Sequence, residues 1–126
     1  MKILILYLAT AALAHAELSV KVDEPAPAGT HSIVKLTMKN NGTNSVQSAR
    51  AAVFLMDADG KVVGQKAEWV IGGTKDKPAL AADASTVFNL LVPTDKPVKS
   101  SKLIFTRIVL TDGQVLPAGQ GYTIEK

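Results

Sequence analysis

The sequence has no cysteine in 126 residues, few aromatic side chains and no large excess of either charge. Without cysteine the chain can form neither disulfides nor thiolate metal sites, and it lacks a cysteine nucleophile. Aromatic residues make up only 5%, and 14 Lys and Arg against 11 Asp and Glu leave a formal charge of +3. This charge is too small and too dispersed to indicate nucleic-acid binding. The length allows one domain.

The one long apolar run lies at the N-terminus, over residues 3–14, and Lys2 precedes it. Ala14 and Ala16 place small residues at the −3 and −1 positions relative to a cut before Glu17. These features form the three-part pattern of a secretory signal peptide, and the run is too short to span a bilayer. An uncleaved anchor and a buried first helix are the alternatives.

We therefore predict a signal peptide over residues 1–16, cut after Ala16, and a single domain over residues 17–126. The remaining chain is about 42% apolar, which is ordinary for a soluble domain. It has no second long apolar run, so we expect no membrane span after cleavage. The predicted location is the periplasm or the extracellular space. Because that compartment is oxidising and the chain has no disulfide, packing alone must hold the domain together.

Beyond Glu17 the apolar residues recur at every second position, which predicts strands. Turn signals separate these segments roughly every 8–12 residues, as in antiparallel sandwiches and barrels. The helical competitors, residues 49–52 and 79–85, are too short to form helices alone. We predict a β-sandwich of seven or eight strands, over residues 18–22, 32–38, 49–56, 61–71, 86–92, 103–110, 114–116 and 121–124.

Three segments resemble the FxLYD type of bacterial immunoglobulin-like domain, over about residues 33–92. They are Thr37–Gly42, where a strand ends in an Asn-Asn turn, Val53–Gly64, where an Asp-Gly-Lys hairpin follows an apolar strand, and Leu80–Phe88. The resemblance implies an immunoglobulin/fibronectin III-like sandwich that works as an extracellular module. The sequence departs from the family at Val53, Met56 and Ala82-Asp83, where the family has Phe, Tyr and Pro-Gly.

The turn over residues 57–60 has the D-x-D-G letters of a calcium loop. Aligning Gly60 with position 6 of an EF-hand puts Leu55 at position 1 and Lys66 at position 12, where oxygen ligands are needed. We therefore interpret the segment as a hairpin turn.

His31 is the single histidine beyond the predicted cut, and no G-x-S-x-G elbow accompanies it. A triad needs a base and an orienting group, and zinc needs several ligands at short spacing. We interpret His31 as a surface histidine and expect a non-enzymatic protein without metal or cofactor. Asn41-Gly42-Thr43 fits a glycosylation sequon, and we interpret it as a turn.

The most suggestive functional feature is an apolar outer face. If Ala51, Val53 and Leu55 face the core, Phe54 and Met56 point outward. Across the turn, Val63, Ala67, Trp69 and Ile71 alternate with Lys66 and Glu68, so Trp69 or Val70 could lie near Phe54 and Met56. Exposed aromatic residues on a sheet bind proteins or glycans. Alternatively, both faces of this strand are covered, or Trp69 belongs to the core.

Phe54, Met56 and Trp69 are thus candidate residues for binding a protein or glycan of the cell envelope. The alternative function is an extracellular proteinase inhibitor, because the hairpin is also similar to that of BsuPI-type inhibitors. Its exposed loop would be Gly72–Lys77 or Pro93–Ser101. Around the second loop a modest basic cluster offers a further place for a partner, formed by Lys96, Lys99, Lys102 and Arg107.

Overall fold

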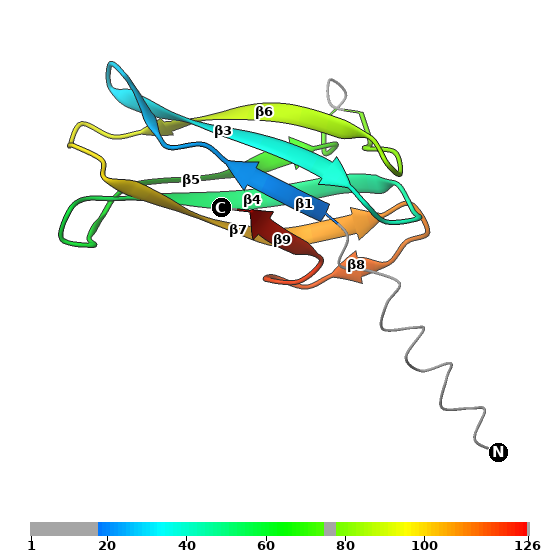
Figure 1. Ribbon diagram of the computed structural model, residues 1–126. Coiled ribbons are helices and arrows are strands. Elements are labelled where there is room, and N and C mark those ends of the chain that lie inside the picture. The colour runs from blue at the N-terminus through cyan, green and yellow to red at the C-terminus, as the bar shows by residue number, and fades with distance from the viewer. Residues whose placement is uncertain (1–17, 75–77, 126) are drawn as a thin grey trace.

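The computed structural model describes residues 18–74 and 78–125, and within these ranges the chain forms strands and turns without a helix (Figure 1). The predicted signal peptide and its cut after Ala16 lie outside the described residues. No helix in the described ranges is long and apolar enough to cross a membrane. The strands are β1 (Leu18–Val22), β2 (Ala26–Ala28), β3 (His31–Asn40), β4 (Val46–Met56), β5 (Val62–Ile71), β6 (Ser85–Pro93), β7 (Ser100–Leu110), β8 (Val115–Leu116) and β9 (Tyr122–Glu125).

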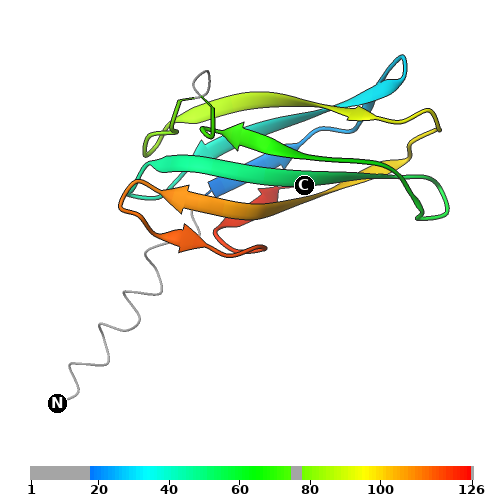
Figure 2. The same ribbon diagram turned by 180° about the vertical axis from the view of Figure 1, so that it is seen from behind.

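The strands form two sheets that pack face to face (Figures 1 and 2). In the five-stranded sheet, β6 pairs with one side of β3, β1 and β2 pair with its other side, and β9 pairs with β1. The four-stranded sheet has the order β5-β4-β7-β8. The all-β sandwich predicted from the sequence is confirmed. One pairing departs from an antiparallel arrangement, because β9 runs parallel to β1.

The strand β2 is absent from the sequence prediction, since the segment contains Pro25 and Pro27 and proline cannot donate a hydrogen bond to a neighbouring strand. In the structure Pro27 lies opposite Ser32 at the border of the sheet, where the missing N–H of proline is tolerated. The described chain therefore has nine strands instead of seven or eight.

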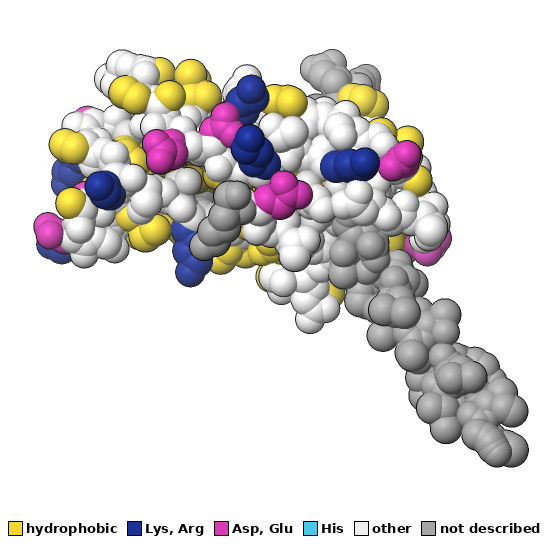
Figure 3. Space-filling view, viewed as in Figure 1, with side chains coloured by type: hydrophobic (Ala, Val, Ile, Leu, Met, Phe, Trp, Pro, Cys, Tyr) yellow, Lys and Arg dark blue, Asp and Glu magenta, His cyan; other side chains and the backbone are white. Residues whose placement is uncertain are grey.

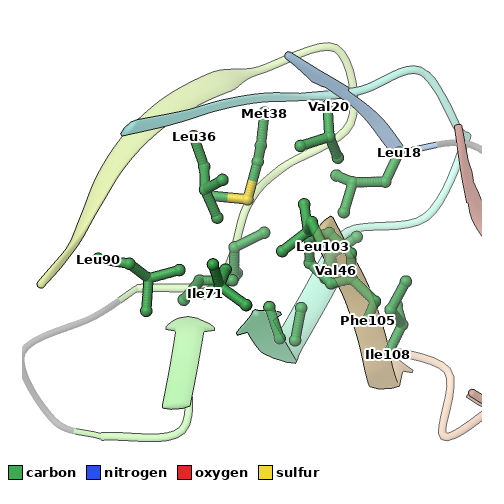
Figure 4. Close-up of a cluster of buried hydrophobic side chains, with 14 of the residues drawn as sticks. Leu18, Val20, Leu36, Met38, Val46, Ile71, Leu90, Leu103, Phe105 and Ile108 are labelled. Carbon is green, nitrogen blue, oxygen red and sulfur yellow. The ribbon is translucent and has the colours of Figure 1, made fainter. Parts of the chain in front are cut away.

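Alternate residues of the long strands fill the space between the sheets. Ala51, Val53 and Leu55 are fully buried, as predicted from the alternation along β4. The largest buried side chain is Phe105, whose ring centroid lies 4.8 Å from that of Tyr122 on β9. Side chains of both sheets meet in this core (Figure 4), among them Leu18, Val20, Leu36, Met38, Leu90, Ile71, Leu103 and Ile108.

The predicted turn between β4 and β5 is present. The Asp57 carboxylate accepts hydrogen bonds from the backbone N–H groups of Asp59 and Lys61, at 2.9 and 3.0 Å. Gly60 has a φ of 82°, which glycine adopts without strain. The aspartate at the start of this turn therefore has a structural role.

The predicted turn at Asn40 begins one residue later, because Asn40 is the last residue of β3 and is almost completely buried. Its Nδ2 donates to the carbonyl groups of Asn44 and Leu80 at 2.8 and 3.1 Å, and its Oδ1 accepts the N–H of Gly42 at 2.9 Å. The side chain thus joins the end of β3 to two other segments.

Candidate binding face of the four-stranded sheet

The three candidate residues from the sequence lie on the four-stranded sheet. Phe54 and Met56 point away from the core and are half-buried. Trp69 is also half-buried and is not part of the hydrophobic core, so the alternative of a core tryptophan is wrong. The predicted outward orientation of Phe54 and Met56 is confirmed.

The expected position of Trp69 beside Phe54 is wrong. Phe54 lies opposite Gln65, whereas Trp69 lies opposite Arg50 further along the sheet. The reason is the pairing register of β5, which the sequence pattern alone does not determine.

A register shift between Ala49 and Arg50 changes the direction of the side chains at the end of β5. Beyond this shift Val70 and Ile71 are buried at 3% and 2% exposure, whereas Trp69 stays on the outside. The sequence pattern had placed Ile71 on the same face as Trp69. A bulge inserts an extra residue and reverses the alternation, so a strict period of two fails here.

We call the outward side of this sheet the β4–β5–β7 face. The register of the three strands defines its members, which are Arg50, Ala52, Phe54, Met56, Val62, Gln65, Ala67, Trp69, Ser100, Lys102, Ile104 and Arg107.

Small side chains form the middle of the face. Ala52 lies opposite Ala67 on β5 and opposite Ile104 on β7. A shallow hollow is lined there by Ala52, Ala67, Phe54 and Gln65. The phenyl ring therefore borders a depression with an alanine floor, which is a surface that an apolar side chain of a partner can enter.

The charged groups of the face all carry the same sign. Arg50 and Arg107 lie directly opposite each other across β4 and β7, and Lys102 lies opposite Phe54. The Arg50 guanidinium carbon is 5.9 Å from the centroid of the Trp69 ring, within range of a cation–π interaction. Among the described residues, no carboxylate forms an ion pair with either arginine. The arginine pair is thus a cationic site beside an aromatic ring.

The outer side of the five-stranded sheet differs in its charge pattern. Figure 3 shows lysine and acidic side chains interspersed over β1, β3 and β9. Lys39 forms an ion pair of 3.5 Å with Asp83 there. Mixed charge is typical of a solvated surface, whereas the described residues of the β4–β5–β7 face combine aromatic groups with charge of one sign.

His31 lies at the start of β3, where its Nδ1 is 3.1 Å from the Thr30 hydroxyl. It is half-buried, at a depression that Pro25, Pro27 and Thr94 also line. Within the described residues, no three His, Cys, Asp or Glu side chains are grouped to hold a metal ion.

The loop predicted at Pro93–Ser101 is shorter in the structure, because β6 ends at Pro93 and β7 begins at Ser100. The Thr94 hydroxyl donates to the Val63 carbonyl at 2.8 Å, and the Lys99 N–H donates to the Met56 carbonyl at 2.7 Å. These bonds fasten both ends of the loop to β4 and β5.

The predicted basic cluster is divided by the start of β7. Lys96 and Lys99 are in the loop, whereas Lys102 and Arg107 belong to β7 and to the β4–β5–β7 face. Of the other loop proposed for an inhibitor, Gly72–Lys77, residues 75–77 lie outside the described ranges.

Comparison with known proteins supports the fold. No family model matches the chain, and a search of curated proteins gives no match. A crystal structure of a Bordetella pertussis protein provisionally identified as ApaA is similar, with a TM-score of 0.56 and 17% identity, covering 80% of this chain and 87% of that chain. A second structure, from the Northeast Structural Genomics Consortium, has a TM-score of 0.51 and 15% identity, covering 82% and 78%. At such identities the likeness concerns the fold alone.

Proposed function

We propose that this chain is a non-enzymatic, immunoglobulin-like binding module, exported to the periplasm or secreted, that holds a partner protein on its β4–β5–β7 face. The observation that carries the proposal is the combination on one face of Phe54 and Trp69 with Arg50 and Arg107, which form no ion pair among the described residues. Export rests on the signal-peptide pattern that ends at Ala16.

The partition of the strands supports an immunoglobulin-like assignment. In constant-type immunoglobulin domains, strands A, B and E share one sheet and strands C, F and G the other. Here β1, β3 and β6 face β4, β7 and β8, which is the same partition by chain order. The strand β5 departs from it, because it pairs with β4 instead of joining the sheet of β6.

A backbone detail supports the resemblance to FxLYD domains. Asp83 stands where that family has the glycine of a Pro-Gly pair, and its φ is 65°. This left-handed conformation is the one that glycine adopts without strain. A glycine at this position would adopt the same backbone conformation without strain, which supports the resemblance.

The arginine pair indicates the chemistry of the partner. Two like charges directly opposite each other on neighbouring strands are destabilising. A partner carboxylate placed between Arg50 and Arg107 would replace this repulsion with charge-assisted hydrogen bonds. The hollow beside Phe54 accepts an apolar side chain at the same time. The expected ligand is a protein surface with acidic and apolar groups.

Photo-crosslinking in cells that export the chain tests this proposal. A benzophenone amino acid replaces Phe54, and a matched variant carries it in place of Lys35, which is exposed on the outer side of the five-stranded sheet. We expect a discrete adduct with an envelope protein from position 54 but not from position 35. Adding Arg50→Glu and Arg107→Glu should abolish the adduct, because the cationic site is then reversed.

Equal labelling from both positions, or an adduct that survives the reversal of both arginines, contradicts the proposal. A protein that crosslinks at neither position but slows a panel of proteases is an inhibitor instead. Retention on a neutral glycan array that disappears with Trp69→Ala alone would indicate a glycan ligand.

A further inference from the structure

The edges of the two sheets are protected to different degrees. At the edge of the four-stranded sheet, β5 carries Lys66 and Glu68 opposite the buried residues Val53 and Ala51, and the two charges form an ion pair of 3.2 Å. Charged side chains on the core side of an edge strand prevent a further strand from adding there. The edge strand β8 has only two residues, and β2 contains a proline.

The strand β6 has none of these protections. Its nine residues, Ser85–Pro93, include no charged side chain, and its proline is the last residue. Among the described strands, only β3 pairs with it. Its outward side chains Val87 and Leu91 are 51% and 44% exposed. A long uncharged edge with exposed β-branched and aliphatic residues is a template for another strand.

The hydrogen bonds at both ends of the β3–β6 ladder show which residues of β6 face this edge. The Asn40 N–H donates to the Ala84 carbonyl at 3.0 Å, and the Thr94 N–H donates to the Thr30 carbonyl at 3.0 Å. In an antiparallel pair, every second residue of a strand directs its N–H and C=O groups toward the neighbouring strand. Since Ala84 and Thr94 do so, the even-numbered residues of β6 between them also direct these groups toward β3. The N–H and C=O groups of Val87, Asn89 and Leu91 therefore point toward the free edge.

From these observations we propose that β6 joins β6 of a second copy of this chain, in an antiparallel pair centred on Asn89. This register places Asn89 opposite Asn89 of the partner subunit, and Val87 opposite Leu91 of the partner subunit. The edge-facing residues of β6 are an aliphatic residue, Asn89 and a second aliphatic residue, whether the strand is followed forward or backward. Two copies that run in opposite directions therefore place aliphatic residues opposite each other on both sides of Asn89. No like charges meet along the pair, and the exposed aliphatic side chains contact each other across it.

The symmetry of such a pair has a structural consequence. A two-fold axis perpendicular to the sheet joins the two five-stranded sheets into one continuous sheet and keeps their outer sides on the same side. Both β4–β5–β7 faces then also point in one common direction. The dimer does not depend on the proposed partner, since none of its contacts involves that face.

Sedimentation equilibrium of the purified exported chain, from about 5 to about 500 µM, tests the dimer. We expect the mean mass to rise toward twice the monomer mass. Asn89→Pro removes an N–H that faces the edge and should weaken association at least about tenfold. The matched control is Val115→Lys, at an exposed position of β8 in the other sheet, which should associate like the wild type. A wild-type monomer at every concentration, or equal weakening by both variants, overturns the proposal.

Because the chain has no cysteine, a single introduced cysteine tests the register even if the proline variant fails to fold. Asn89→Cys meets its own counterpart across the two-fold axis, where the Cα atoms of a hydrogen-bonded pair are about 5.5 Å apart and a disulfide can form. Ser85→Cys on the same strand lies too far from its counterpart. We expect a disulfide-linked dimer with the first variant only. Linking with both variants, or with neither, overturns the register. Phe54→Ala should leave the dimer unchanged. A failure of the dimer proposal can therefore be distinguished from a failure of the proposed partner binding.

Discussion

Asn40 and Asp83 are two polar residues that together close the end of the five-stranded sheet. The Asp83 N–H donates to the Asn40 carbonyl at 2.7 Å, and the Asn40 side chain reaches Leu80 and Asn44. The sequence predicts a turn here from its Asn-Asn-Gly letters. It does not reveal that Asn40 is buried, because burial depends on the segment around Leu80, which is 40 residues away.

Replacing Asn40 with alanine leaves the Asn44 carbonyl and the Gly42 N–H without their side-chain partners in a partly buried turn. We expect Asn40→Ala to lower the free energy of unfolding by about 1–3 kcal/mol. The neighbouring Asn41 is exposed, and so is its hydrogen bond to the Ser19 hydroxyl, so Asn41→Ala should change the free energy of unfolding by less than about 0.5 kcal/mol. Urea unfolding curves measure both. Equal losses would show that the buried amide has no special role.

The φ of 65° at Asp83 predicts a difference between two substitutions that both remove its carboxylate. Asp83→Ala keeps a Cβ in the left-handed region, whereas Asp83→Gly relieves that strain. We expect the glycine variant to be more stable than the alanine variant by about 1 kcal/mol. The ion pair with Lys39 is exposed and contributes little. Thermal melts compare the two variants, and an alanine variant as stable as the glycine variant would contradict the expectation.

At the scale of elements, β4 follows its sequence pattern and β5 does not. From Ala51 to Leu55 the β4–β5 register is regular, so the period of two correctly separates core residues from outward ones. Register shifts at both ends of the pair, between Ala49 and Arg50 and between Leu55 and Met56, change the alternation on β5. A bulge depends on the contacts between strands and leaves no local signature, so the opposition of Trp69 to Arg50 was missed. The pairing of Arg50 with Arg107 was missed for the same reason.

At Gly64, β5 lies close to the last residue of β6 and to the residue that follows it. A Cβ at this position would lie 2.6 Å from the Pro93 carbonyl oxygen and 3.1 Å from the Thr94 Cβ. Gly64→Ala therefore forces backbone apart, and we expect it to lower the free energy of unfolding by about 1–3 kcal/mol. Gln65→Ala, at the next and exposed position of β5, should cost less than about 0.5 kcal/mol. Chemical denaturation followed by tryptophan fluorescence measures both, and an unchanged midpoint for Gly64→Ala would rule out the close contact.

At the scale of the whole molecule, stability depends on one apolar core between the sheets, since the chain has no disulfide. Phe105 of β7 is its largest fully buried side chain and contacts Tyr122 on β9, the strand that runs parallel to β1. One side chain thereby connects the two sheets.

Replacing each of two phenylalanines with alanine distinguishes a core residue from a residue of the β4–β5–β7 face by the loss of stability. We expect Phe105→Ala to lower the free energy of unfolding by about 3–5 kcal/mol, because it leaves a cavity in the core. Phe54→Ala removes a half-buried ring from the outer face and should cost about 1 kcal/mol or less. Calorimetric melts of both variants check this difference. A large loss with Phe54→Ala would mean that the ring belongs to the fold and not to a binding face.

Residue patterns along the chain are enough to predict the all-β sandwich, most strand positions, the hairpin turn at Asp57–Gly60 and the outward direction of Phe54 and Met56. These features depend on local chemistry, namely the period of two and the turn residues. The register of β5, the opposition of Arg50 and Arg107, and the parallel pairing of β9 with β1 become visible in the folded chain and not in these patterns. Such pairings join residues far apart in the chain, and the packing of the whole sandwich selects among them.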